Sequence, residues 1–221
     1  MNHHPDTTRP TGVLARGGPF AWRAIDLVTL AVLGVAFGVV FWGFSTFIYP
    51  LVEVFTQLFP PAGELMLGVW LLPAVLGALV VRRPGAALFI ELVAASIEAI
   101  LGNKWGGAVL ISAVLQAGGV EFAVALYRWR RWKLDVAVLA GALAAVSEIV
   151  LYEWWTYVAE YSPLYKAAYL GCGVISGVVV AGILSWKAIQ LLAATGVLHA
   201  FPAGEELLAA EATVEDDIPH P

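Results

Sequence analysis

The sequence has little charge, and its histidines lie only near its two ends. Charged residues make up 13% of the 221 residues and hydrophobic residues 60%, whereas ordinary soluble domains are about 25% charged and about 45–50% apolar. The histidines are His3, His4, His199 and His220. The apolar middle of the chain therefore offers no imidazole to bind a metal or to activate a nucleophile.

Cysteine and phosphate-binding motifs are also scarce. Cys172 is the single cysteine, so no intramolecular disulfide can form. The pattern G-x-x-x-x-G-K-[ST] does not occur, so any work driven by ATP must be powered by a partner. No basic stripe lies outside the loops, which argues against nucleic acid as a partner. We expect neither a cofactor nor a bound metal.

Six long apolar runs occupy most of the chain and predict an all-α integral membrane protein with six transmembrane helices in one bundle. No apolar signal-peptide core precedes the first run, so we expect that run to remain as a span. The membrane domain is predicted over 21–195, between a disordered tail at 1–20 and a disordered acidic tail at 196–221. Segment 49–64 contains three prolines and is expected to lie on the membrane surface or to dip back into it. The predicted spans are 27–48, 65–81, 86–101, 107–127, 134–158 and 165–195.

Lysine and arginine predict the orientation. With the N-terminus inside, ten of the twelve basic residues fall on the cytoplasmic side, and only Lys104 and Lys166 fall outside. This is a strong positive-inside bias. Both termini are therefore predicted to be cytoplasmic, in a multi-pass protein of the plasma membrane.

Carboxylates lie inside or at the edge of these apolar runs, at Glu91, Glu98, Glu121, Glu148 and Glu153. A carboxylate at membrane depth costs a few kcal/mol and usually faces a cavity, a partner or a substrate. Glu91 and Glu98 are seven residues apart and share a helix face. The spacing of Glu148, Tyr152 and Trp155 also predicts a shared face, whereas Glu153 is expected to be solvated. The glutamates could instead bond to neighbouring helices or to one another.

The outer half of the predicted bundle is rich in Trp, Tyr and Glu. Aromatic faces beside a carboxylate in a site with little water suit an organic cation. Interfacial aromatic belts of ordinary membrane proteins are the alternative explanation for these rings. The candidate substrate-binding residues are Glu98, Trp105, Trp42, Glu64, Trp70, Gln116, Glu91, Glu121, Tyr152 and Trp155.

Small residues recur at intervals of three or four in two of the runs. Ala31, Gly34 and Gly38 form one stripe, and the second runs through Gly173, Gly177, Ala181 and Ser185. Small residues let helix backbones approach closely. Each stripe is either internal packing or a docking face for another membrane subunit, and the first is our candidate docking face.

Several short motifs together resemble the YkoE-type S component of energy-coupling factor (ECF) transporters over about residues 22–190. The most specific block is Glu91-Leu92-x-Ala94-x-x-x-Glu98-x-x-x-Gly102-x-x-Trp105-Gly106, followed by Gln116-x-x-x-x-Glu121. Weaker matches are Trp22-Arg23-x-x-Asp26, Gly34-x-x-x-Gly38, Gly68-Val69-Trp70-Leu71-Leu72-Pro73 and Arg83-Pro84-Gly85.

The resemblance implies a subunit that captures thiamine or its hydroxymethylpyrimidine precursor from outside and then docks to a T subunit and two ABC-type ATPases. The chain departs from better-known thiamine S components, which have a pocket histidine and an Ala-x-x-x-Ala docking step. A self-sufficient secondary transporter or channel that uses the intramembrane glutamates is the first alternative. An enzyme is not expected, because neither a histidine nor a Ser–Lys pair is evident within the spans.

Overall fold

The computed structural model describes residues 20–206 and 209, and in this part of the chain every regular element is a helix. The first half contains α1 (Ala24–Gly43), the π-helical η1 (Phe44–Ile48), α2 (Tyr49–Thr56), the 3-10 helix η2 (Pro60–Met66), α3 (Gly68–Val81) and α4 (Ala86–Leu101). The second half contains η3 (Gly106–Ala108), α5 (Val109–Leu126), α6 (Leu134–Glu148), the π-helical η4 (Ile149–Glu153), α7 (Trp154–Thr156), α8 (Pro163–Ser176), the π-helical η5 (Gly177–Leu184) and α9 (Ser185–Ala194).

Five continuous helical stretches among the described residues are long and apolar enough to cross a membrane: Ala24–Thr56, Pro60–Val81, Gly106–Leu126, Leu134–Thr156 and Pro163–Ala194. They confirm five of the predicted spans. The remaining one, 86–101, is the helix α4, whose 16 residues are fewer than the roughly 20 that a perpendicular crossing needs.

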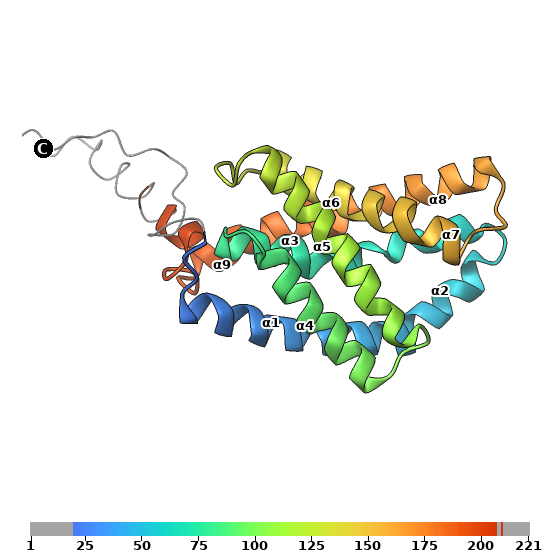
Figure 1. Ribbon diagram of the computed structural model, residues 1–221, viewed down its shortest axis with the longest axis horizontal. Coiled ribbons are helices and arrows are strands. Elements are labelled where there is room, and N and C mark those ends of the chain that lie inside the picture. The colour runs from blue at the N-terminus through green and yellow to red at the C-terminus, as the bar shows by residue number, and fades with distance from the viewer. Residues whose placement is uncertain (1–19, 207–208, 210–221) are drawn as a thin grey trace, which may run out of the picture.

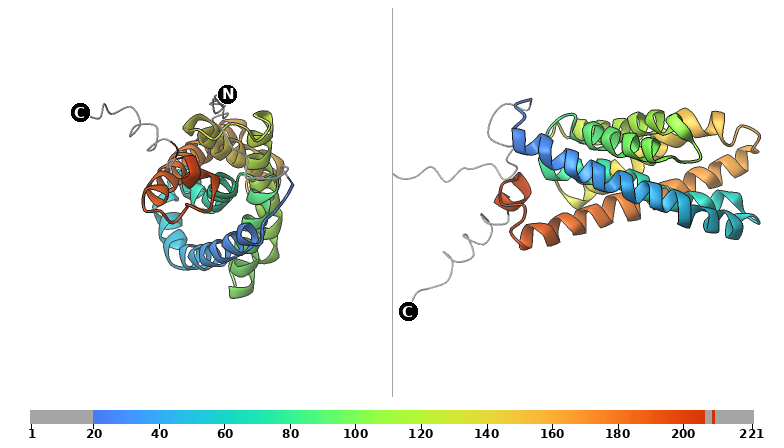
Figure 2. Two further views of the ribbon diagram at one scale, coloured as in Figure 1. Left: turned by 90° about the vertical axis from the view of Figure 1, so that its left-hand side faces the viewer. Right: turned by 90° about the horizontal axis from the view of Figure 1, so that it is seen from below.

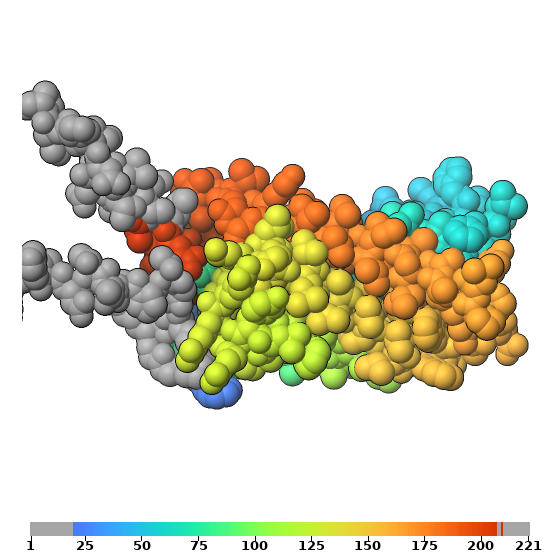
Figure 3. Space-filling model, turned by 90° about the horizontal axis from the view of Figure 1, so that it is seen from above, coloured from blue at the N-terminus to red at the C-terminus, as the bar shows by residue number. Residues whose placement is uncertain are grey.

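The helices form one elongated bundle with α3 in its interior. Most side chains of α3 are buried, and this helix contacts α1, α4, α5, α6 and α9. In the end-on view the helices surround a common long axis (Figure 2). Along one face the C-terminal span, α8 to α9, lies beside α6 (Figure 3).

The first span is longer than predicted, because Pro50 does not end it. The backbone N–H of Tyr49 donates to the carbonyl of Phe44, five residues earlier, so the chain is π-helical immediately before the proline. Proline has no N–H and cannot donate the usual helical hydrogen bond. The wider π turn alters the backbone hydrogen bonds at this position. The helix then continues through α2 to Thr56. Residues 49–56 therefore continue the helix of the first span.

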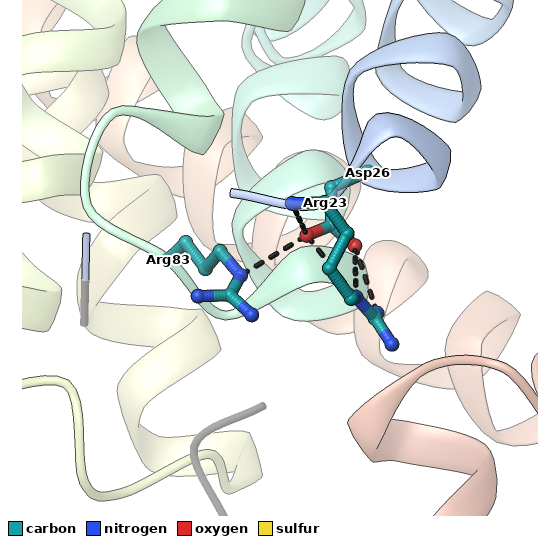
Figure 4. Close-up of polar contacts among 3 residues, drawn as sticks. All are labelled: Arg23, Asp26 and Arg83. Carbon is teal, nitrogen blue, oxygen red and sulfur yellow. Dashed lines mark hydrogen bonds and ion pairs between the residues drawn. The ribbon is translucent and has the colours of Figure 1, made fainter. Parts of the chain in front are cut away.

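One end of the bundle, which we call the arginine end, is held by buried ion pairs. Asp26 lies in the first turn of α1 and accepts hydrogen bonds from Arg23 and from Arg83 Nε, the latter at 3.0 Å (Figure 4). Asp26 and Arg83 are both almost fully buried, and breaking such a pair leaves an uncompensated charge. The contact therefore fixes the start of α1 to the turn between α3 and α4.

The first part of the C-terminal tail packs against this arginine end, in contrast to the disordered tail predicted over 196–221. Leu198, Phe201 and Ala203 are buried in the main core, and Arg82 donates two hydrogen bonds to the carboxylate of Glu206. The partners are 124 residues apart, so the acidic composition of the tail gave no indication of the contact. The predicted tail at 1–19, with 207–208 and 210–221, lies outside the described residues.

The glycines of the first small-residue stripe are buried inside the chain. A Cβ at Gly34 would lie 2.8 Å from Val93 Cβ, and one at Gly38 would lie 2.5 Å from Ile97 Cβ. These contacts seat α1 directly on α4. Gly34 and Gly38 are therefore not available to a partner helix in this arrangement, whereas Ala31 is only partly buried. The second stripe is also internal, because Gly177 faces Gly141 of α6.

Candidate substrate-binding site

The end of the bundle opposite the arginine end is formed by α2, α7 and the start of α8 (Figure 1). A partly open cavity lies between the helices toward this end. Counted out to its open side, where it joins the solvent, it contains about 620 Å³ of space. Its lining mixes aromatic, carboxyl and small side chains from most of the helices. The lining residues are Phe41, Tyr49, Gly63, Glu64, Leu67, Trp70, Glu91, Ala95, Glu98, Trp105, Val109, Ser112, Gln116, Glu148, Glu153, Tyr157 and Tyr169.

Three aromatic rings meet edge to face on one side of the cavity. The ring centroids of Tyr49 and Trp70 are 5.8 Å apart, those of Tyr49 and Trp105 5.3 Å, and those of Trp70 and Trp105 5.7 Å. Aromatic pairs favour this tilted geometry because each ring edge meets the negative face of its neighbour. The three rings hold one another in place, so the cavity has a preformed aromatic wall.

Five glutamates supply the polar part of the lining. Their exposed fractions are 7% for Glu64, 1% for Glu91, 0% for Glu98, 1% for Glu148 and 6% for Glu153. In each of them the Oε2 atom is buried without a hydrogen-bond partner among the residues that the structure describes. An unsatisfied buried polar atom is costly, and five of them in one cavity call for a bound group with hydrogen-bond donors or positive charge.

The π-helical segment η4 decides which side chains of the fifth span reach the cavity. An α-helix would align Glu148, Tyr152 and Trp155, as predicted, but the wider π turn brings positions five apart onto one face. Glu148 and Glu153 accordingly both line the cavity, whereas Tyr152 and Trp155 do not. The expectation that Glu153 is solvated is wrong. Trp155 is 69% exposed, and its indole N–H donates to the carbonyl of Val150 at 2.8 Å.

Six of the ten candidate residues come together in the cavity: Glu98, Trp105, Glu64, Trp70, Gln116 and Glu91. Trp70 Nε1 lies 3.5 Å from Glu98 Oε1, which joins the aromatic wall to the carboxyl groups. Trp42 does not line the cavity and packs instead on Phe47. Glu121 accepts a hydrogen bond from the backbone N–H of Ala87, so it caps the start of α4 near the arginine end.

Besides Tyr49, two further tyrosines that are not among the candidates line the site. Tyr169 of α8 interacts with the carboxyl groups of both Glu64 and Glu153. Tyr157 follows the fifth span, where burial and the neighbouring Tyr152 raise the pKa of its hydroxyl above the ordinary value. It therefore stays neutral and can donate a hydrogen bond. Neither residue interrupts an apolar run as a charge does, so neither can be recognised from the sequence in the way that a buried glutamate can.

A lysine stands beside the cavity without lining it. Lys104 pairs with Glu53 and lies over the rings of Tyr49 and Trp105, 4.1 and 4.8 Å from their centroids. These rings thus already attract a cation in the chain itself. No group of three or more His, Cys, Asp and Glu side chains within the described ranges is placed to hold a metal ion. The arrangement of rings and carboxyl groups suits an organic cation.

Three comparisons place the chain among known proteins. The family model described as "ABC-type cobalt transport system, permease component" matches residues 25–147. The protein of Bacillus subtilis (strain 168) named as an HMP/thiamine permease protein, YkoE, is 34% identical over 187 residues, which cover 85% of this chain and 92% of that protein.

A solved structure titled "Crystal structure of an S-component of ECF transporter" matches with a TM-score of 0.83 and 32% identity, and covers 90% of this chain and 100% of that one. These relatives are membrane transport proteins and not enzymes. The prediction of a multi-pass plasma-membrane protein of this class is thereby confirmed. The chain belongs to the YkoE family of S components of ECF transporters.

Proposed function

We propose that this chain captures thiamine, or its hydroxymethylpyrimidine precursor, from outside the cell and delivers it through an ECF complex. The observation that carries this proposal is the set of five buried, unpartnered glutamate oxygens beside three aromatic rings in one cavity. The name of the Bacillus subtilis relative supports the choice of ligand.

The two halves of thiamine fit the two kinds of lining. Its thiazolium ring is a cation, which aromatic faces and carboxyl groups both attract. Its flat aminopyrimidine offers donors and acceptors at its edge, and Glu98 and Gln116 can read that edge while Trp105 stacks on a ring. Hydroxymethylpyrimidine has only the second half, so we expect it to bind more weakly.

The proposed topology has six crossings and two cytoplasmic termini. The arginine end holds the ion pairs of Arg23, Arg82 and Arg83, and the cavity end holds Lys104 and Lys166. The positive-inside bias thus supports a cavity that opens outward. The short α4 can cross if the bilayer thins locally at its ends.

The proposed partners are a T subunit and two ABC-type ATPases. The sequence contains no phosphate-binding loop, so any energy that ATP supplies for release into the cell must come through other subunits. A secondary transporter would instead couple uptake to an ion gradient through its own glutamates.

Reconstitution in liposomes tests this proposal. We expect the purified chain to bind labelled thiamine without hydrolysing ATP. Under an imposed proton gradient, liposomes that contain only this chain should not accumulate thiamine. Co-reconstitution with the T subunit and both ATPases should allow accumulation that depends on ATP. Concentrative uptake by the chain alone would contradict the proposal and favour the secondary transporter.

A further inference from the structure

The cavity carries acidic groups along its depth and no basic group. Among the described residues that line it there are five glutamates and no lysine, arginine or histidine. Glu91 and Glu98 are seven residues apart on α4, or about 10 Å along the helix axis. Glu64, Glu148 and Glu153 reach the same cavity from η2, α6 and η4. An anionic group placed at any depth would therefore lie close to carboxyl oxygens.

The positive groups nearest to the cavity do not offset these carboxyl groups. Lys104 is paired with Glu53, and Lys166 donates to the backbone carbonyl of Trp154 at 3.1 Å. The N-terminal end of α5, where Val109 lines the cavity, contributes about half a positive charge. A buried phosphate needs cationic or multiple N–H donors to replace its water, and the lining offers neither in sufficient number.

We infer that this cavity excludes phosphate esters of its ligand and accepts only the unphosphorylated alcohol. The inference rests on the proposed capture of a thiamine-type molecule. A phosphate ester outside the cell must then be hydrolysed before capture. Water adds its hydroxyl to phosphorus and its proton to the alcohol oxygen, the ester P–O bond breaks, and inorganic phosphate leaves. Any phosphoryl transfer to the ligand can only follow its delivery into the cytoplasm.

Calorimetric titration of the purified chain in nanodiscs with thiamine, thiamine monophosphate and O-acetylthiamine tests the inference. The acetyl ester adds bulk at the same oxygen without adding negative charge. Because like charges repel strongly in a site with little water, we expect the monophosphate to bind about a hundredfold or more weakly than thiamine. The acetyl ester should bind within about tenfold of thiamine. Equal exclusion of both esters would show that size decides, and would overturn the inference.

Matched variants locate the source of exclusion. Removing one cavity carboxylate in Glu153→Gln should reduce the ratio between monophosphate and thiamine dissociation constants by about tenfold, because one close repulsion is lost. Glu64→Gln is a second variant with the same expectation. Glu160→Gln makes the same change of charge at an exposed position outside the cavity and should leave the ratio unchanged.

An unchanged ratio in both cavity variants, or similar affinity for thiamine and its monophosphate, would contradict the inference and leave vitamin capture intact. Absence of thiamine binding in the unsubstituted chain would contradict both.

Discussion

Trp105 is one of the three rings that form the aromatic wall of the cavity. Its ring contacts those of Tyr49 and Trp70 and lies under the ammonium group of Lys104. A tryptophan face near a desolvated cation is worth about 2 kcal/mol. At the residue scale, the ring is therefore expected to stabilise the bound ligand directly and to keep its neighbours in position.

We predict that Trp105→Ala weakens thiamine binding by about tenfold to a hundredfold, which corresponds to the loss of one desolvated aromatic contact. Trp155→Ala is the matched control, because Trp155 is exposed and does not line the cavity. Calorimetric titration of both variants measures the difference. Equal effects of the two substitutions would favour an interfacial belt as the role of both rings.

The cost of burying charge made some site residues predictable from the sequence. Glu91 and Glu98 interrupt an apolar run, and the structure places both in the cavity. Tyr49 and Tyr169 could not be identified in this way, because tyrosine is common at membrane interfaces. Glu121 interrupts a run as well, yet it caps a helix. A buried carboxylate therefore indicates a partner without showing whether that partner is a ligand or a backbone amide.

At the scale of single elements, π-helical segments account for the largest errors in the predicted site. The sequence around η4 has the apolar character of an ordinary α-helix, so an α-helical period was assumed for the fifth span. Because of one π turn, Glu153 lines the cavity, and the predicted pair, Tyr152 and Trp155, does not. The same kind of turn at η1 lets the first span continue past Pro50.

The contact between α1 and α4 explains why a glycine repeat could not be assigned from spacing alone. Close packing within a chain and docking between chains both require small residues, so the repeat was compatible with either. The collisions that a Cβ would make with Val93 and Ile97 decide in favour of internal packing.

We predict that Gly38→Ala destabilises the chain, because its Cβ would lie 2.5 Å from Ile97 Cβ and 2.6 Å from the Ala94 carbonyl oxygen. Overpacking of this kind costs roughly 1–3 kcal/mol. Gly43→Ala is the matched control on the same helix, because its Cβ meets nothing within 4 Å, and it should leave stability unchanged or slightly raised. Thermal unfolding in detergent gives the comparison. A Gly38→Ala chain of unaltered stability that no longer assembles with its partners would restore the docking role.

For the whole molecule, the length of the hydrophobic runs predicts the helical bundle well. It does not predict contacts between segments that are far apart in the sequence. Five spans were identified because about 20 apolar residues have few other uses. The packing of 196–206 was missed because Arg82 and Glu206 become neighbours only in the folded chain. Composition describes each segment separately, whereas the ion pair needs the segment of Arg82 and the segment of Glu206 to meet in the folded chain.

We predict that the cavity end faces outward and the arginine end inward. In a chain carrying Cys172→Ala, a cysteine at Glu160 should react with an impermeant maleimide added to intact cells. A cysteine at Lys133 should react only after the membrane is permeabilised. Both positions are exposed in the structure, so a difference in reactivity shows on which side of the membrane each residue lies and does not reflect burial. Labelling with the two positions reversed would overturn the proposed topology and direction of capture.

The most direct test of the account is equilibrium titration of the purified chain with thiamine, beside Glu98→Gln and Glu160→Gln. Glu98 is fully buried in the cavity with one oxygen unpartnered, and loss of a charged hydrogen-bond partner costs about 1.5–3 kcal/mol. The account predicts saturable binding that Glu98→Gln weakens by roughly ten- to a hundredfold, whereas Glu160→Gln has little effect. Unchanged affinity in Glu98→Gln, or no binding to the unsubstituted chain, would contradict the claim that this cavity captures the vitamin.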